Sequence, residues 1–73
     1  MSQNFLRSPK ATVLAAAPKA KCVKDWTRGG TYRIDFGCEV QDFNRRPITS
    51  LQTGTANPAD AWFAAAVELR LIG

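Results

Sequence analysis

The chain has 73 residues, a net charge of +4, and hydrophobic residues at 45% of its length. A chain of this size forms one small domain whose core leaves no room for a deep substrate cleft. It contains no histidine, and its two cysteines, Cys22 and Cys38, cannot complete a zinc site by themselves. We therefore predict a protein that is not an enzyme and that uses no cofactor and no metal.

The positive charge lies in the first half of the chain. Residues 1–33 carry seven Lys and Arg against one Asp, a net charge of +6, whereas residues 34–73 carry three Arg against five carboxylates, a net charge of −2. Such a basic end suits an acidic partner, either nucleic acid or an acidic protein surface. The alternative is that the charge only keeps a flexible end in solution. The sparse cysteines favour a reducing cytosol.

Residues 1–18 show no sustained periodicity, and Pro9 and Pro18 bracket an alanine-rich run. We expect this segment to be a flexible basic arm with little fixed structure. Its apolar run has seven residues, too few to span a membrane, and the proline directly after it disfavours a signal peptide. Phe5 and Leu6 are either incidental residues of this arm or a short motif that docks on a partner.

Residues 31–43, TYRIDFGCEVQDF, alternate apolar and polar side chains over ten positions. A period of two predicts a strand with one buried face, and we place this strand at the centre of a sheet. A first strand is expected over residues 19–28, joined to the central one through Gly29 and Gly30. Adjacent glycines supply the positive φ values that tight hairpins require.

The length of this first loop sets the register of the hairpin. A two-residue loop would place Trp26 opposite Arg33, on the polar face of the central strand. A three-residue loop places Trp26 opposite Ile34 and Cys22 opposite Cys38, on the apolar face, and we favour this register. The two thiols would then lie side by side as small buried side chains rather than as a redox pair.

Residues 43–47, FNRRP, predict a turn, and residues 48–53 a short third strand. Pro47 has no N–H to donate to a neighbouring strand, so this strand belongs at an edge of the sheet. Arg45 and Arg46 should lie at the tip of this second hairpin. There they are either solvated or in contact with a partner.

The last element has the clearest boundaries in the sequence. Asn57 can cap a helix, Pro58 fits its first position, and Asp60 complements its positive end. These residues predict a helix from Pro58 to about Ile72. Its several alanines would let it lie close to the sheet.

We therefore predict an α+β fold in which a three-stranded antiparallel sheet is packed by one C-terminal helix, in the order βββα, over residues 19–73. Trp62 and Phe63 are expected to anchor the core, and the protein to be a monomer. The apolar width of the helix exceeds one stripe, so Leu69 or Ile72 could instead serve a dimer or partner surface.

The sequence bears on three classes of function. A sheet with a basic end can enter a DNA groove, as in the arm-binding domains of phage integrases, but the polar face of the central strand has a mixed or negative charge that repels phosphate. The basic arm alone could still hold nucleic acid. An enzyme would need a base, a nucleophile pair or a metal cluster that this sequence cannot assemble. A protein-binding regulator needs only a small fold and a charged contact surface, and we favour it.

Two stretches suggest which regulator this is: MSQNFLRSPK at residues 1–10 and NPADAWFAAAVELRLIG at residues 57–73. With the length and the sheet-then-helix order, they resemble the small transcription regulators that lytic Xanthomonas phages make. The resemblance implies a protein of the host bacterial cytoplasm that binds RNA polymerase near the N-terminal region of the β′ subunit. It further implies that the protein inhibits promoter initiation by disfavouring σ retention and promotes antitermination.

On this hypothesis the protein competes sterically and allosterically for a polymerase surface. Phe5 and Leu6 would dock, and the paired arginines of the second turn would add contacts. Charge steering would slow association as the salt concentration rises. The residues expected to steer the approach are Arg7, Lys10, Lys19, Lys21 and Lys24.

Overall fold

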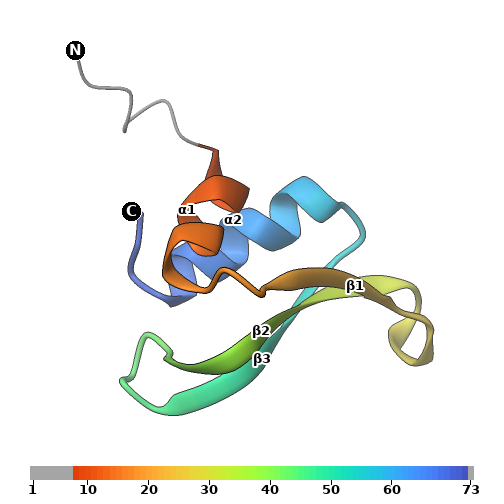
Figure 1. The fold of residues 1–73 in the computed structure, drawn as a ribbon. Helices are drawn as coiled ribbons and strands as arrows, with labels where there is room; N and C mark the ends of the chain where they lie inside the picture. The colour runs from red at the N-terminus through yellow and green to blue at the C-terminus, as the bar shows by residue number, and fades with distance from the viewer. Residues whose placement is uncertain (1–7, 73) are drawn as a thin grey trace.

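The computed structural model describes residues 8–72. Its three strands form one antiparallel sheet in the order β1-β2-β3, and the C-terminal helix α2 packs against that sheet. The predicted βββα fold is confirmed, with one further helix, α1, beside α2 (Figure 1). In chain order the elements are α1 (Pro9–Ala16), β1 (Lys21–Asp25), the 3-10 turn η2 (Trp26–Arg28), β2 (Thr31–Gln41), β3 (Pro47–Thr55) and α2 (Pro58–Glu68).

The central strand β2 provides the sheet's share of the core. Ile34 and Phe36 are completely buried, as the alternation predicts. The alternation ends at Gly37, which has a φ of 70° and lies where the pairing of β2 with β3 shifts register. Beyond this bulge Cys38 is exposed rather than buried, because an irregular step in a strand redirects the side chains that follow it. β3 lies at an edge of the sheet, as expected from Pro47.

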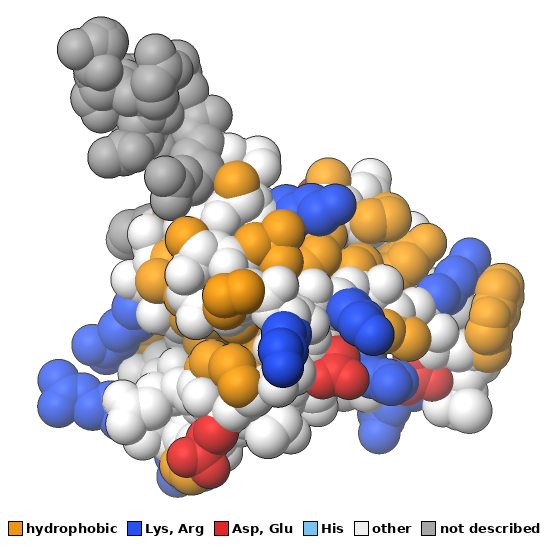
Figure 2. All heavy atoms as spheres, in the orientation of Figure 1, with side chains coloured by type: hydrophobic (Ala, Val, Ile, Leu, Met, Phe, Trp, Pro, Cys, Tyr) orange, Lys and Arg blue, Asp and Glu red, His pale blue; other side chains and the backbone are white. Residues whose placement is uncertain are grey.

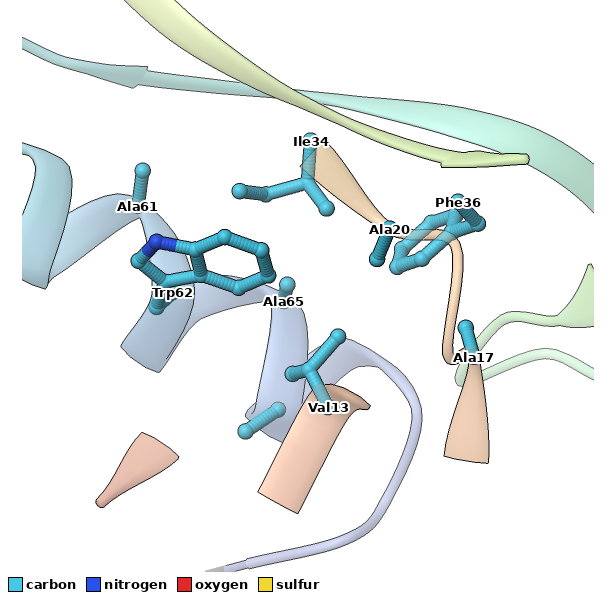
Figure 3. Packing of buried hydrophobic residues seen from close by; sticks show 9 residues of the cluster. Val13, Ala17, Ala20, Ile34, Phe36, Ala61, Trp62 and Ala65 are labelled. Carbon is cyan, nitrogen blue, oxygen red and sulfur yellow. The ribbon is translucent and has the colours of Figure 1, made fainter. Parts of the chain in front are cut away.

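Small and large side chains share the core. Trp62 of α2 lies beside Ile34 of β2, and Val13 of α1 belongs to the same cluster (Figure 3). The buried side chains on the helices are mostly alanines, which let the helices approach closely. The complete buried set is Val13, Ala17, Ala20, Ile34, Phe36, Ala61, Trp62, Ala65 and Ala66.

The helix α1 corrects the expectation that residues 1–18 form an arm without fixed structure. The Ser8 hydroxyl accepts a hydrogen bond from the N–H of Ala11 at 3.1 Å, and Pro9 occupies the first turn, where its missing N–H costs nothing. Val13 is completely buried in the shared core. Pro9 therefore begins a helix instead of preventing one. Residues 1–7 of the expected arm lie outside the described residues.

The β1–β2 hairpin also differs from both of the registers considered. Cys22 lies opposite Ile34 and Asp25 opposite Thr31, so the connection is longer than expected and contains η2. The Asp25 carboxylate stabilises this connection, because its Oδ1 accepts hydrogen bonds from the N–H and the hydroxyl of Thr27 at 3.1 and 2.6 Å. Trp26 is consequently 75% exposed. The thiols of Cys22 and Cys38 are not partners across the strands.

The start of α2 is confirmed, but its end is not. The Asn57 side chain accepts a hydrogen bond from the N–H of Ala59 at 2.8 Å, and the helix begins at Pro58. It ends at Glu68, before the expected Ile72, because Arg70 adopts a left-handed conformation with a φ of 59°. The N–H groups of Arg70 and Leu71 then donate to the carbonyls of Val67 and Ala66, which is the Schellman pattern of hydrogen bonds.

The two aromatic residues at the middle of α2 have different surroundings. Trp62 is only 7% exposed and anchors the core as expected, whereas Phe63 is 53% exposed. Successive helical residues point about 100° apart, so the two neighbours cannot both face the sheet. The expectation that Phe63 is a core anchor is wrong.

Candidate partner-binding site

The structure does not gather the residues predicted to contact a partner into one patch. Lys10 lies on α1, and Lys19, Lys21 and Lys24 lie before and along β1. Arg45 and Arg46 lie in the β2–β3 turn, at the other end of the sheet from η2 (Figure 1). Lys and Arg side chains accordingly appear at several separate places on the face shown in Figure 2. Phe5, Leu6 and Arg7 lie outside the described residues.

An apolar groove lies where the end of α2 meets the β2–β3 turn. It has a volume of about 480 Å³ and is lined by Phe43, Val67, Arg70, Leu71 and Ile72. We call it the Phe43 groove. Phe43 is 49% exposed, and Val67 and Leu71 are each 37% exposed. Large side chains left this open on a small domain mark a surface that a partner can cover.

Two contacts hold the two sides of the Phe43 groove together. The N–H of Phe43 donates a hydrogen bond to Oε2 of Glu68 at 3.2 Å. The guanidinium carbon of Arg70 lies 4.3 Å from the centre of the Phe43 ring, within the range of a cation–π contact. The aromatic ring is therefore fixed in place by residues that follow it by more than twenty positions.

The charges around the groove are mostly positive toward a partner. The Asp42 carboxylate accepts hydrogen bonds from the N–H groups of Asn44 and Arg46 at 2.8 and 2.9 Å, and Glu68 is engaged by Phe43. Both carboxylates are thus occupied by backbone groups of the turn. Within residues 8–72 the single ion pair joins Arg33 to Asp25. The three arginines at this end of the fold, Arg45, Arg46 and Arg70, have no carboxylate partner there.

Two of these arginines have an uncommon backbone conformation. Among the described residues, Arg45 and Arg70 are the non-glycine residues with positive φ, at 63° and 59°. The left-handed region costs a residue with a Cβ roughly 1 kcal/mol and is normally occupied by glycine or asparagine. Backbone geometry alone would not favour arginine at either position.

Two groups with shifted pKa values, Asp25 and Cys22, do not line the Phe43 groove. Hydrogen bonds from Thr27, and then from Gln52 and the charge of Arg33, hold the pKa of Asp25 below its usual value. Burial raises the pKa of the Cys22 thiol. In the part of the chain that the structure describes, no three His, Cys, Asp or Glu side chains are grouped to hold a metal ion. No helix between residues 8 and 72 has the length and apolar character needed to cross a membrane.

Comparison of the chain with protein-family models, curated proteins and solved structures finds no match. A functional hypothesis therefore depends on the Phe43 groove and on the sequence.

Sequence reasoning anticipated the arginines of the β2–β3 turn but missed the apolar residues beside them. One signal was available, since Phe63 and Val67 are four residues apart and add a second apolar stripe to α2. The excess apolar width of the helix points instead to Leu69 or Ile72. Both residues pack against the core and are partly buried, and of the two Ile72 also lines the Phe43 groove.

Proposed function

We propose that the protein is a non-enzymatic regulator that binds bacterial RNA polymerase through the Phe43 groove. The observation that carries this proposal is the groove itself, an exposed apolar surface lined by Arg70, on a fold whose other large side chains mostly enter the core. Arg45 and Arg46 are exposed in the turn that begins beside Phe43. Aromatic residues and arginine are enriched at the energetically important positions of protein interfaces. This surface fits a partner segment that presents apolar side chains flanked by carboxylates.

The conformation of Arg45 and Arg70 supports a binding role for their side chains. Glycine at either position would relieve the strain of a positive φ. Residues held in sparsely populated conformations concentrate at functional sites, where the side chain provides an interaction that the backbone alone does not need. Two such arginines at the same end of the molecule favour recognition of an acidic surface.

The choice of RNA polymerase rests on the resemblance to the Xanthomonas phage regulators. The second stretch that carries it, residues 57–73, includes α2 and four of the five residues that line the groove. The resemblance adds a contact near the N-terminal region of β′, inhibition of promoter initiation by disfavoured σ retention, and antitermination. The protein would act as a monomer in the host bacterial cytoplasm.

The alternative, a sheet that enters a DNA groove as in the integrase arm-binding domains, has less support. The face of the sheet opposite the helices carries Asp25 and Asp35, and its Arg33 is paired with Asp25 at 3.6 Å. Two carboxylates on that face would meet the phosphates of a duplex laid across it, and one arginine is already engaged.

Binding to purified bacterial RNA polymerase tests the proposal directly. We expect the tagged protein to bind the polymerase after nuclease treatment, and the double variant Arg45→Glu/Arg46→Glu to bind at least about tenfold more weakly. Arg28→Glu, a charge reversal of the same kind in η2, is the matched control and should retain its affinity. Both changes lie at exposed positions, and circular dichroism would establish that the variants are folded.

Transcription assays then separate binding from regulation. With σ-containing polymerase, the protein should lower promoter-dependent synthesis. With elongating polymerase, it should increase read-through of a terminator, and the double variant should have lost both effects. Wild-type binding by the double variant would exclude the Phe43 groove as the contact surface. Failure of the parent protein to bind polymerase at all would refute the proposed partner.

A further inference from the structure

We propose that the outer edge of β1, together with Trp26, binds single-stranded nucleic acid. Trp26 is the most exposed large apolar side chain of the described residues, at 75%. The ammonium of Lys24 lies 4.3 Å from the centre of its ring. This end of the sheet lies away from the Phe43 groove, so the inference goes beyond the proposed function and does not depend on it.

The turn holds the indole outward instead of letting it collapse onto the core. The Asp25 carboxylate caps η2 through its two hydrogen bonds with Thr27, and the N–H of Gly30 donates to the carbonyl of Asp25 at 3.2 Å. A Cβ at Gly30 would lie 3.6 Å from the indole, so the glycine packs against the ring. A preorganised aromatic surface loses little conformational entropy when a ligand stacks on it.

Positive charges follow the same edge of the sheet. β1 is an outer strand, and four exposed cations lie just before, along or just after it: Lys19, Lys21, Lys24 and Arg28. The carboxylate in this segment, Asp25, is engaged by Arg33 at 3.6 Å and by Gln52 at 3.3 Å. Lys21 and Lys24 are three positions apart and therefore extend from opposite faces of β1, with Lys21 opposite Asp35, so the cations flank the outer edge of the sheet on its two sides.

This combination matches the way in which proteins bind single strands. A cationic track holds the phosphate backbone while exposed aromatic rings stack on unpaired bases. Paired bases are already stacked on their neighbours, so a lone indole on a turn gains little from the interior of a duplex. A protein partner fits less well, because Lys24 and Gly30 lie against the Trp26 ring and no second large apolar side chain of the exposed set lies in the turn.

The test measures binding of the full chain to fluorescently labelled oligo(dT) and oligo(U) of about 12 nucleotides by anisotropy. We expect binding at low salt and weaker binding of a duplex of the same length. For each tenfold increase in salt concentration, the logarithm of the association constant should fall by about 0.7 per phosphate neutralised. Stacking should also quench the fluorescence of Trp26, whereas the other tryptophan, Trp62, is buried and should contribute little change.

Variants decide whether the turn is responsible. Trp26→Ala should weaken binding about tenfold, and Trp26→Phe should retain most of it, since phenylalanine also stacks. Phe63→Ala removes another exposed aromatic ring, on α2, and should leave the affinity unchanged. Arg45→Glu/Arg46→Glu reverses two charges at the opposite end and should weaken binding much less than Lys21→Glu/Lys24→Glu does. Circular dichroism of each variant would establish its fold.

Three outcomes would overturn the inference. The first is no binding of either oligonucleotide at low salt. The second is a folded Trp26→Ala variant that binds single strands as tightly as the parent. The third is loss of polymerase binding on Trp26→Ala with unchanged oligonucleotide binding, which would make the turn a protein contact. None of these outcomes bears on Arg45 and Arg46, so the Phe43 groove is tested separately.

Discussion

The guanidinium of Arg70 lies over the ring of Phe43, with 4.3 Å between the guanidinium carbon and the ring centre. This contact joins the end of α2 to the β2–β3 turn. The hydrogen bond from Phe43 to Glu68 ties the same two segments together at 3.2 Å. A partner that binds here would therefore meet one continuous surface built from segments that are distant in the sequence.

Arg70→Gly separates the structural role of this residue from its binding role. The change removes the cost of a positive φ, about 1 kcal/mol, and forfeits an exposed cation–π contact of about 0.5 kcal/mol. We expect a melting temperature at least equal to that of the parent and about tenfold weaker binding to polymerase. A lower melting temperature with unchanged binding would show that Arg70 serves only the fold.

Trp62→Ala and Phe63→Ala form a pair of neighbouring changes with different expected effects. Trp62 is 7% exposed, and truncating a buried tryptophan costs about 3–5 kcal/mol, much of the stability of a small domain. Phe63 is 53% exposed, and its truncation should change the stability by about 0.5 kcal/mol or less. Urea unfolding measures both. Equal losses of stability would contradict an α2 that turns Trp62 toward the core and Phe63 toward solvent.

Val13→Ala tests whether α1 belongs to the core. Val13 is completely buried, and removing two methyl groups at about 0.8 kcal/mol each, with a cavity left behind, should cost about 2 kcal/mol. Ala15→Ser, at an exposed position of the same helix, should cost about 0.5 kcal/mol through helix propensity. If residues 9–16 were a flexible arm, the two variants would have the same free energy of unfolding in denaturant.

Asp25 should make a pH-dependent contribution to stability. Its pKa is lowered in the folded protein, chiefly by the hydrogen bond from the Thr27 hydroxyl, so its ionised form is stabilised by folding. This contribution is present above the unfolded pKa, near pH 4, and is lost as the pH falls through the lower folded pKa. The stability difference between the parent and Asp25→Asn should therefore shrink as the solution is acidified from neutral pH to below pH 4. The other carboxylates are common to both proteins, and a constant difference would contradict the assignment.

The two thiols should react at different rates. Cys38 is exposed, whereas Cys22 is partly covered and burial raises the pKa of its thiol, which lowers the fraction of reactive thiolate. Brief treatment with iodoacetamide, followed by mass spectrometry of the peptides, should find the label first on Cys38. Equal labelling would favour the side-by-side pairing that the sequence first suggested.

Several features of the fold follow from local chemistry and could be predicted from the order of the residues. The alternation through Ile34 and Phe36 specified a central strand, and Asn57 followed by Pro58 specified the start of α2. Pro47 identified an edge strand because its missing N–H is a property of the residue alone. For the candidate site, the turn composition placed Arg45 and Arg46 at the surface. Each of these conclusions depends only on residues that are neighbours in the chain.

Other features depend on contacts between segments that are distant in the chain. An isolated eight-residue helix is marginal in water, and α1 is stabilised by burying Val13 and Ala17 against the rest of the core. The hairpin register is an exception, because the Asp25 cap on Thr27 that closes its turn is a local contact between residues two positions apart. The exposure of Phe43 and Leu71 could not be read from their chemistry, because both would suit a core. A small domain buries only the side chains that its few elements can reach, and the ones left uncovered become its candidate surface for a partner.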